Sequence, residues 1–246
     1  MAPHLILIPG TMCDQRLFAA VARRLRPGVA VQVARWRELL GTAPPAWWHD
    51  GRPLNLLGFS LGGIWALQRL GLRQTDPAQA PTIQRLALLG SNADPAGPAI
   101  IRRSREQRWL LARRGTTALA RAVKARYFAS RPHRWQAQLV LDMARRTPRG
   151  MARRQIKLAA GRSDGLHALA NFQGPVAVWA GRQDGLCPAP QQQRMRQARA
   201  DAISHTWSGC GHMIPLEAPG RLAIAIRRWL SQPLSPLEPI AGVPKR

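Results

Sequence analysis

Acidic residues and lysine are scarce in this chain of 246 residues. Twelve aspartates and glutamates stand against 37 lysines and arginines, which gives a formal net charge of +25 at pH 7. Lys124, Lys157 and Lys245 are the three lysines, so 34 of the basic residues are arginine. The codon usage of a GC-rich genome explains part of this excess. It does not explain the shortage of acids, so an acidic partner such as nucleic acid, anionic lipid or an acidic carrier protein stays open.

Cysteine is also rare, and its spacing excludes two kinds of chemistry. Cys13, Cys187 and Cys210 form neither a disulfide framework nor a paired Cys-x-x-Cys metal pattern. This count fits a reducing cytosol, so we expect a cytoplasmic protein without such a metal site. We interpret all three as small packing residues, because no strained turn presents Cys13 as a nucleophile.

Long hydrophobic runs are missing as well. No run approaches the roughly 20 apolar residues of a membrane-spanning helix. The segment MAPHLILIPG has only a short apolar run, with neither a basic leader nor a small-residue cleavage site, so we expect a soluble, unprocessed chain. Basic motifs interleaved with aromatic residues are absent too, which leaves nucleic-acid binding supported by charge alone.

Short apolar runs alternate with helical patterns over most of the chain. Five of six runs are typical of buried parallel strands, and the sixth is weaker because it contains Ser204 and His205. This alternation predicts an α/β fold, with a mostly parallel sheet of about six strands covered by helices on both faces. The expected strands are His4 to Ile8, Val29 to Ala34, Leu54 to Gly58, Ile83 to Gly90, Pro175 to Ala180 and Ala202 to Trp207. The expected helices begin at Asp14, after Ser60, at Ala189 and at Pro219.

Residues 94–170 break the alternation. This interval has no convincing strand, and it holds 18 basic and 4 acidic residues, so more than half of the net charge lies there. We therefore expect a helical lid (94–170) inserted into a core formed by residues 1–93 and 171–246. The expected lid helices are Pro98 to Arg114, Thr116 to Ala129, Pro132 to Arg146 and Pro148 to Gly161, the last with Thr147 as its N-cap.

Two other segments are expected to be irregular. Residues 35–52 carry Pro44-Pro45 and leave little room for a full crossover helix. Residues 231–246 contain four prolines, which predicts a loosely ordered extension.

The sequence Gly58-Phe59-Ser60-Leu61-Gly62 ends an expected strand and opens an expected helix. A nucleophilic serine on a sharp strand-to-helix turn needs glycines on both sides, since neighbouring backbone passes too close for side chains. The letters alone also fit a glycine-rich turn with a surface serine. Their position between a strand and a helix favours Ser60 as a nucleophile.

An acid and a histidine follow Ser60, each in a loop after a later strand, in the chain order that such serine hydrolases use. Asp184 follows the apolar stretch of VAVWAGRQDG, and His212 lies in the glycine-rich loop of WSGCGHM. Asp184 could instead be a turn former, and Asp201 could replace it, but Asp201 precedes a strand at the opposite end of the sheet. The glycine loop favours His212 over the other histidines. These are His4, His49, His133, His167 and His205.

Together these residues predict nucleophilic catalysis on an acyl group. Ser60 would attack the carbonyl, His212 would remove and return the proton, and Asp184 would fix the imidazole tautomer. The tetrahedral intermediate needs an oxyanion hole. We predict the Leu61 backbone N–H as one donor and the Thr11 N–H as the other, with Met12 as the alternative.

The segments LILIPGTMCDQRLF, LLGFSLGG, GRQDGLCP and SGCGHMIPLEAP resemble the α/β-hydrolase superfamily with a helical lid. The resemblance covers nearly the whole chain. The chain is similar in particular to small bacterial hydrolases with a PGxxCD oxyanion loop and to pimeloyl-acyl-carrier-protein methyl ester esterases. It implies an ester-cleaving serine hydrolase without a cofactor. Pro9 stands where the family usually has histidine, and the usual first two strands are missing, which bears on substrate class rather than on the triad.

The expected lid carries candidates for substrate and partner binding. Its apolar side chains either line an acyl pocket or form the lid's own core. Its arginines either dock an acidic acyl carrier protein or form a solvated cationic face. The candidate pocket residues are Met12, in the loop after the first expected strand, and Trp109, Tyr127 and Phe128 in the lid. The candidate docking residues are Arg102, Arg103, Arg105, Arg113, Arg114, Arg153 and Arg154.

The leading hypothesis is hydrolysis of a carboxylic ester through an acyl-enzyme on Ser60, with a small acyl ester or a carrier-linked methyl ester as substrate. Thioester cleavage, perhydrolase or haloperoxidase-like activity and C–C bond hydrolysis use the same triad, so the sequence does not separate them. A catalytically silent basic binding protein is the remaining alternative, and it rests on charge alone.

Overall fold

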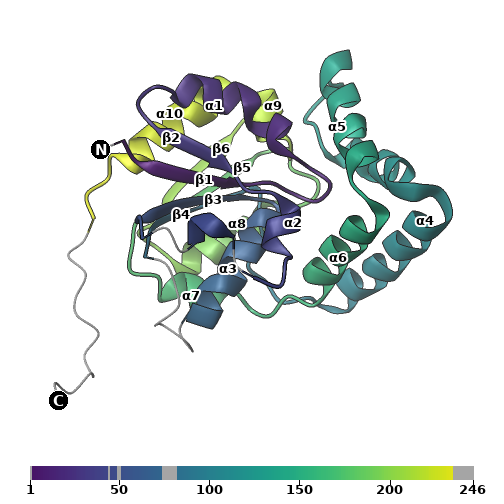
Figure 1. Cartoon of the computed structure of the whole chain (residues 1–246), viewed down its shortest axis with the longest axis horizontal. Coiled ribbons are helices and arrows are strands. Elements are labelled where there is room, and N and C mark those ends of the chain that lie inside the picture. Colours follow the sequence, from purple (N-terminus) through teal and green to yellow (C-terminus); the bar gives the residue numbers. More distant parts are fainter. Residues whose placement is uncertain (1, 44, 49–50, 74–81, 235–246) are drawn as a thin grey trace.

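A six-stranded sheet forms the centre of the protein (Figure 1). The structure is a computed structural model and describes residues 2–43, 45–48, 51–73 and 82–234. The strand order is β2-β1-β3-β4-β5-β6, and every neighbouring pair is parallel. The predicted parallel sheet of six strands is therefore confirmed. The strands are β1 (His4–Ile8), β2 (Ala30–Val33), β3 (Leu54–Phe59), β4 (Ile83–Leu89), β5 (Val176–Gly181) and β6 (Ile203–Trp207).

Helices cover both faces of this sheet, because alternate strand residues point to opposite faces and are apolar in both directions. Leu5 and Leu7 pack in one core with the helices α1 and α10, and Ile6 and Ile8 pack in a second core with α3, α7 and α8. Figure 1 shows α1 beside α10 on one side of the sheet and α3 on the other. These helices are α1 (Ala19–Leu25), α3 (Leu61–Arg73), α7 (Leu166–Ala170), α8 (Ala189–Ala198) and α10 (Pro219–Leu230).

The two edge strands differ from the central ones in burial. β6 exposes Ser204 and His205, which matches its weaker sequence pattern. β2 is half-buried to exposed along its length, so the prediction that it is a buried strand is wrong. An edge strand has a neighbour on one side only, and fewer side chains cover it than cover a central strand.

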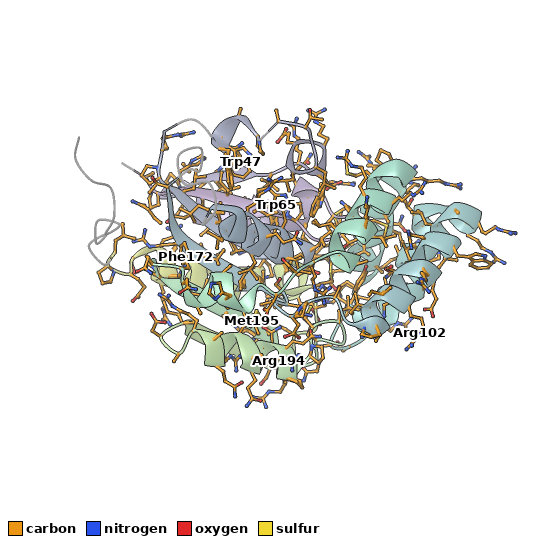
Figure 2. The ribbon with its side chains drawn as sticks, turned by 90° about the horizontal axis from the view of Figure 1, so that it is seen from below. Trp47, Trp65, Arg102, Phe172, Arg194 and Met195 are labelled. Carbon is orange, nitrogen blue, oxygen red and sulfur yellow. The ribbon has the colours of Figure 1, made fainter. Side chains whose placement is uncertain are left out.

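The connection between β2 and β3 is held by tryptophans rather than by a crossover helix. Its described residues form the short helix α2 (Trp36–Leu39) and a 3-10 turn at Ala46–Trp48. The rings of Trp47, Trp48 and Trp65 meet edge to face at 5.8 to 6.4 Å between centroids, and Figure 2 labels two of them over the same part of the sheet. The expected irregular segment is confirmed for its described residues; positions 44, 49 and 50 lie outside them.

Three long helices follow β4 and stand together beside the sheet (Figure 1). They are α4 (Pro98–Val123), α5 (Arg134–Arg146) and α6 (Arg149–Ala160), with a 3-10 turn at Lys124–Arg126. Gly115 has a φ of +77° and divides α4 in two, at the boundary predicted between Arg114 and Thr116. The helices share an apolar core of their own that includes Leu111, Leu119, Ala144, Ala152 and Ile156, and Met12 from the loop after β1 joins it.

Some local predictions need correction. Thr147 Oγ1 donates a hydrogen bond of 3.0 Å to the Met143 carbonyl, so Thr147 ends α5, and Pro148 occupies the N-cap position of α6. A further short helix, α7, was not expected within 94–170. A second short helix that was not expected, α9 (Ile214–Glu217), follows the His212 loop. Most of the predicted C-terminal extension, residues 235–246, lies outside the described part of the chain.

Candidate active site

Ser60 occupies the sharp turn between β3 and α3 with a φ of +53°, a conformation that costs energy for any residue with a side chain. Its N–H donates to the Leu89 carbonyl at 2.9 Å, and its carbonyl accepts from Ser91 Oγ at 2.8 Å. A Cβ at position 62 would lie 2.3 Å from the Ile8 carbonyl oxygen. Only glycine fits there, which gives the second glycine of the motif its physical reason.

Asp184 and His212 form a buried pair at the ends of β5 and β6. Asp184 Oδ2 and His212 Nδ1 are 2.8 Å apart, and both side chains are almost completely buried. The other carboxylate oxygen, Oδ1, accepts from the backbone N–H groups of Leu186 and Cys187, each at 2.8 Å. Because an ionised carboxylate only accepts, the His212 Nδ1 carries the proton and Nε2 has a free lone pair.

The competing acid lies elsewhere. Asp201 is exposed and forms an ion pair with Arg199 at 2.6 Å, in the turn before β6. Parallel strands place their starts and their ends at opposite edges of the sheet, so Asp201 cannot reach the histidine loop.

Aromatic rings and a carboxylate hold the His212 loop. The Phe59 ring lies 4.9 Å from the imidazole, and the Tyr127 ring is nearly parallel to it at 6.1 Å. Glu217 accepts from the N–H of Gly211 at 3.0 Å and from the N–H of Ala129 at 2.9 Å. Burial raises the pKa of Glu217. The sequence analysis missed Glu217, although it lies in the quoted segment SGCGHMIPLEAP.

Ser60 and His212 line the same cavity of about 340 Å³, which lies between the sheet and the helices α4 and α6. Within the described part of the chain, no hydrogen bond joins Ser60 Oγ to the imidazole. Catalytic hydrogen bonds are commonly long before substrate binds, so the shared cavity is the relevant observation.

The expected oxyanion donors lie at the same cavity. Leu61 is the first residue of α3, where a backbone N–H has no partner within its own helix. Thr11 lines the cavity. The Met12 N–H donates to Gln155 Oε1 at 3.0 Å, so this alternative donor is already occupied. Gln155 is fully buried, and no local sequence pattern marks it.

The four candidate pocket residues divide into two groups. Met12 and Tyr127 line the cavity with Ser60. Trp109 is 60% exposed and lines a separate outer groove, and Phe128 packs in the core beside the His212 loop. The prediction for Trp109 and Phe128 is therefore wrong. Helical spacing cannot tell which face of α4 meets the site, and Phe128 lies after the 3-10 turn rather than in the expected helix.

The candidate docking arginines are all exposed, as Arg102 is on α4 in Figure 2. Arg103 lines the Ser60 cavity. Arg105 and Arg153 line the outer groove of about 550 Å³ between α4 and α6. Sequence analysis missed Arg126 and Arg162, which line the Ser60 cavity too. The other docking candidates lie outside both cavities: Arg102, Arg113, Arg114 and Arg154.

The cysteines carry no sign of nucleophilic or metal chemistry. Burial raises the pKa of Cys13 to about 12, and it also raises the pKa of Cys187. Asp184, Cys187 and His212 lie close enough to be considered as metal ligands, yet Asp184 and His212 already bind each other. Cys187 remains a thiol at neutral pH and would be a poor ligand.

The described residues include no helix long and apolar enough to cross a membrane. No curated protein matched the chain. Solved structures match over 94% of its length. An esterase from Thermogutta terrifontis has 21% identity, 90% coverage of its chain and a TM-score of 0.78. An enol-lactonase from Burkholderia xenovorans has 18% identity, 92% coverage of its chain and a TM-score of 0.76. A bromoperoxidase from Bacillus anthracis has 15% identity, 93% coverage of its chain and a TM-score of 0.75.

At such identities these likenesses concern the fold. The family model described as the alpha/beta hydrolase family matches residues 5–225, which includes the Ser60 turn and both loops of the Asp184–His212 pair. The predicted resemblance to the superfamily is confirmed: the chain belongs to the alpha/beta hydrolase family.

Proposed function

We propose that this protein is a serine hydrolase that cleaves a carboxylic ester through an acyl-enzyme on Ser60. The observation that carries the proposal is the buried Asp184–His212 pair of 2.8 Å beside the cavity that Ser60 shares. The esterases among the similar structures support the reaction class.

The proposed reaction is acyl transfer through Ser60. Ser60 Oγ attacks the carbonyl carbon while His212 Nε2 takes its proton, and Asp184 stabilises the imidazolium through Nδ1. The N–H groups of Leu61 and Thr11 bind the oxyanion. The imidazolium then protonates the leaving alcohol. Water repeats the sequence on the acyl-enzyme and releases the acid, and Ser60 recovers its proton.

A fluorophosphonate probe tests the nucleophile. We expect covalent labelling of the wild-type protein at Ser60, and turnover of p-nitrophenyl butyrate. Ser60→Ala should remove labelling and lower kcat by at least about 10³-fold. Ser91→Ala is the matched control: its hydroxyl donates a hydrogen bond to the Ser60 carbonyl but does not line the cavity, so labelling at Ser60 should persist. A wild-type protein that neither labels nor turns over would support the silent basic binding protein.

Other reactions of the same triad need a direct comparison. Thioester cleavage, C–C bond hydrolysis and perhydrolase or haloperoxidase-like activity remain candidates. The similar structures include an enol-lactonase and a bromoperoxidase, so reactions other than simple ester hydrolysis need to be tested. Matched butyryl oxygen esters and thioesters, together with a peroxide-dependent bromination assay, would rank them. A thioester kcat/KM well above that of the ester would replace the ester proposal.

We also propose that residues 94–170 form a lid that can dock an acidic acyl carrier protein presenting a methyl ester. Arg105, Arg108, Arg149 and Arg153 line the outer groove together with Trp109, and no acidic residue lines it. Such a surface attracts an acidic partner over a Debye length of about 10 Å at 0.1 M salt. This docking would seat the acyl arm toward Ser60, as the resemblance to pimeloyl-acyl-carrier-protein methyl ester esterases suggests.

The test is the ratio of kcat/KM for a carrier-linked methyl ester to that for the free methyl ester. A large ratio at low salt that collapses at high salt supports docking. Arg105→Glu with Arg153→Glu should lower the ratio, whereas Arg24→Glu, on α1, should leave it unchanged. A ratio near one in all conditions contradicts the proposal and leaves a small-ester hydrolase.

A further inference from the structure

We propose that the ester substrate carries an anionic group of its own, a carboxylate or a phosphate, which Arg103, Arg126 and Arg162 bind inside the Ser60 cavity. This inference rests on the proposed hydrolase function and names the substrate class for that site. It differs from the docking surface, since the three arginines face the reaction cavity rather than the outer groove.

The charge of the cavity is one-sided. Three arginines line it, and no aspartate or glutamate is among its lining residues. None of the three forms an ion pair within the described part of the chain. The codon usage of a GC-rich genome accounts for arginines in solvent, where a guanidinium group costs little. It does not account for the buried Arg162 and the half-buried Arg126 in a cavity wall, where an absent counterion is costly.

Arg162 forms the deep part of this site. It is only 7% exposed, and its Nε and Nη1 donate to the carbonyls of Asp94 at 2.7 Å and Ala159 at 2.9 Å. Its Nη2 has no hydrogen-bond partner among the described residues. Two carbonyls thus fix the guanidinium and leave one edge for a ligand, which is how arginine binds carboxylates and phosphates.

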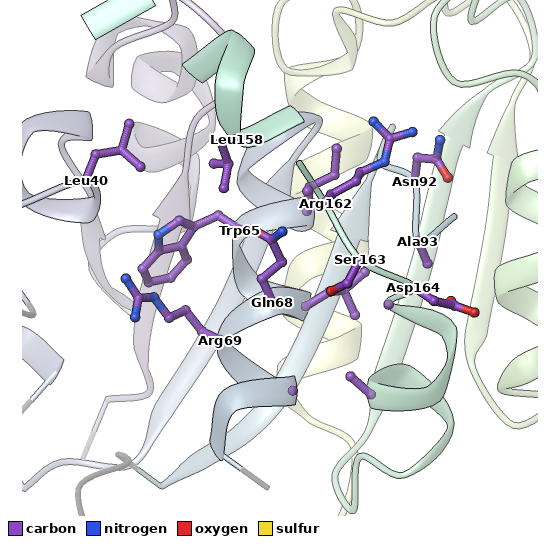
Figure 3. Close-up of a pocket in the computed structure, with 15 residues that line it drawn as sticks. Leu40, Trp65, Gln68, Arg69, Asn92, Ala93, Leu158, Arg162, Ser163 and Asp164 are labelled. Atoms are coloured by element: carbon purple, nitrogen blue, oxygen red, sulfur yellow. The ribbon is translucent and has the colours of Figure 1, made fainter. Parts of the chain in front are cut away.

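The neighbourhood of Arg162 is polar and open on two sides. Arg162 and Asn92 line both the Ser60 cavity and a second cavity of about 380 Å³. Figure 3 shows these two side chains at one end of that second cavity, away from Trp65 and Arg69. Gln191 also lines the Ser60 cavity, and its buried Oε1 has no partner. This wall is therefore built for a polar group rather than for an alkyl chain.

Arg126 and Arg103 complete the site nearer its mouth. Arg126 donates to the Gly185 carbonyl, next to Asp184. Burial lowers the pKa of Arg126, and the nearby Arg103 charge lowers it further, while the nearby Asp184 and Cys187 act in the opposite direction. Arg126 is half-buried and Arg103 is exposed at the edge of the cavity. Two guanidinium groups that repel each other are stabilised when an anion binds between them. A substrate anion supplies that charge.

The remaining wall is apolar and suits the rest of an acyl group. Leu119, Val123 and Ile156 line it on the helices, and Tyr127 lies beside His212. A short chain with an ester at one end and an anion at the other matches this division. The half ester of a dicarboxylic acid is the simplest such substrate.

The experiment compares charged and neutral esters of equal length. The mono-p-nitrophenyl esters of succinate, glutarate and adipate are measured against p-nitrophenyl butyrate, valerate and hexanoate. We expect at least one half ester to exceed its neutral partner at least tenfold in kcat/KM, with the free dicarboxylate as a competitive inhibitor. An O-phosphorylated ω-hydroxyacyl ester forms the second arm and distinguishes phosphate from carboxylate.

Variants assign the effect to these arginines. Arg126→Gln and Arg103→Gln should lower kcat/KM for the half ester at least tenfold more than for the neutral ester, mostly through KM. Arg121→Gln is the matched control, because it removes the same charge from an exposed position of α4 but lines neither the Ser60 cavity nor the outer groove. Arg162→Lys keeps the charge and should weaken binding while circular dichroism stays unchanged.

The outcomes separate the two proposals. Turnover of neutral esters through Ser60 without any preference for either anion overturns the arginine site and leaves the hydrolase standing. A preference that Arg126→Gln and Arg103→Gln do not reduce also overturns it. Absence of fluorophosphonate labelling and of all turnover overturns the hydrolase itself.

Discussion

Gln155 Oε1, on helix α6, accepts a hydrogen bond of 3.0 Å from the backbone N–H of Met12, in the loop after β1. Met12 has a φ of +54°, and its side chain packs in the core of the helices α4 to α6. The loop after β1 is thus fastened to the helices α4 to α6 at both backbone and side chain. Thr11, the residue before Met12, lines the Ser60 cavity.

Replacing Gln155 by leucine should leave the buried Met12 N–H without an acceptor. We expect a loss of about 1–3 kcal/mol of stability and a decrease of kcat of about tenfold, since the loop that carries Thr11 would move. Thermal denaturation and p-nitrophenyl ester kinetics measure both. Gln138→Leu, an exposed change on α5, is the control and should alter neither. A Gln155→Leu enzyme with full kcat would contradict the positioning role.

Gly90 has a φ of +51°, and a Cβ there would lie 3.2 Å from Asp184 Oδ2 and 3.4 Å from His212 Nδ1. Gly90→Ala should therefore displace the acid–histidine pair and lower kcat by about tenfold, with a loss of about 1–2 kcal/mol from the left-handed backbone. In Gly71→Ala the new Cβ meets nothing within 4 Å in helix α3, and this control should be stabilised. Equal activities of the two variants would argue against a catalytic Asp184–His212 pair.

Glu217 links stability to pH, because burial raises its pKa in the folded protein. A group with a raised folded pKa stabilises the fold fully below its unfolded pKa, about 4.3 for glutamate, and less as the pH rises through the folded value. The Tm of wild type minus the Tm of Glu217→Gln should therefore fall from pH 4 to pH 7. A rise of this value with pH would contradict the assignment. Glu217→Ala should be less stable than either at every pH, since Gly211 and Ala129 then lose their acceptor.

The thiols should be inert in the folded protein. A pKa of about 12 for Cys13 leaves about one thiolate in 10⁴ at pH 8, and each further pH unit raises that fraction tenfold. Iodoacetamide at pH 8 should leave the native mass and the esterase activity unchanged. The urea-unfolded chain, with its three cysteines, should add three carbamidomethyl groups. Rapid inactivation at pH 8 would instead assign a reactive cysteine to the site.

The sequence by itself determined the parallel sheet and the helical interval, and it singled out Ser60, Asp184 and His212 as the candidate triad. These depend on local signals: apolar periodicity, glycines around a tight turn, and loops that follow strands. Parallel strands end at one edge of the sheet, so three loops far apart in sequence had to meet. The chain order of the candidate triad and the loops that carry it could therefore be proposed without coordinates.

Only the tertiary structure decided which side chains meet that triad. Gln155, Glu217 and Gly90 act through contacts across 143, 88 and up to 122 positions of sequence, which no local pattern encodes. The same limit explains Trp109, which has the spacing of a pocket residue but lies on the outer face of α4. Arginine is so common here that its placement carried no signal in the sequence. The packing of the helices alone distinguishes Arg103, Arg126 and Arg162, at the cavity, from the arginines in solvent.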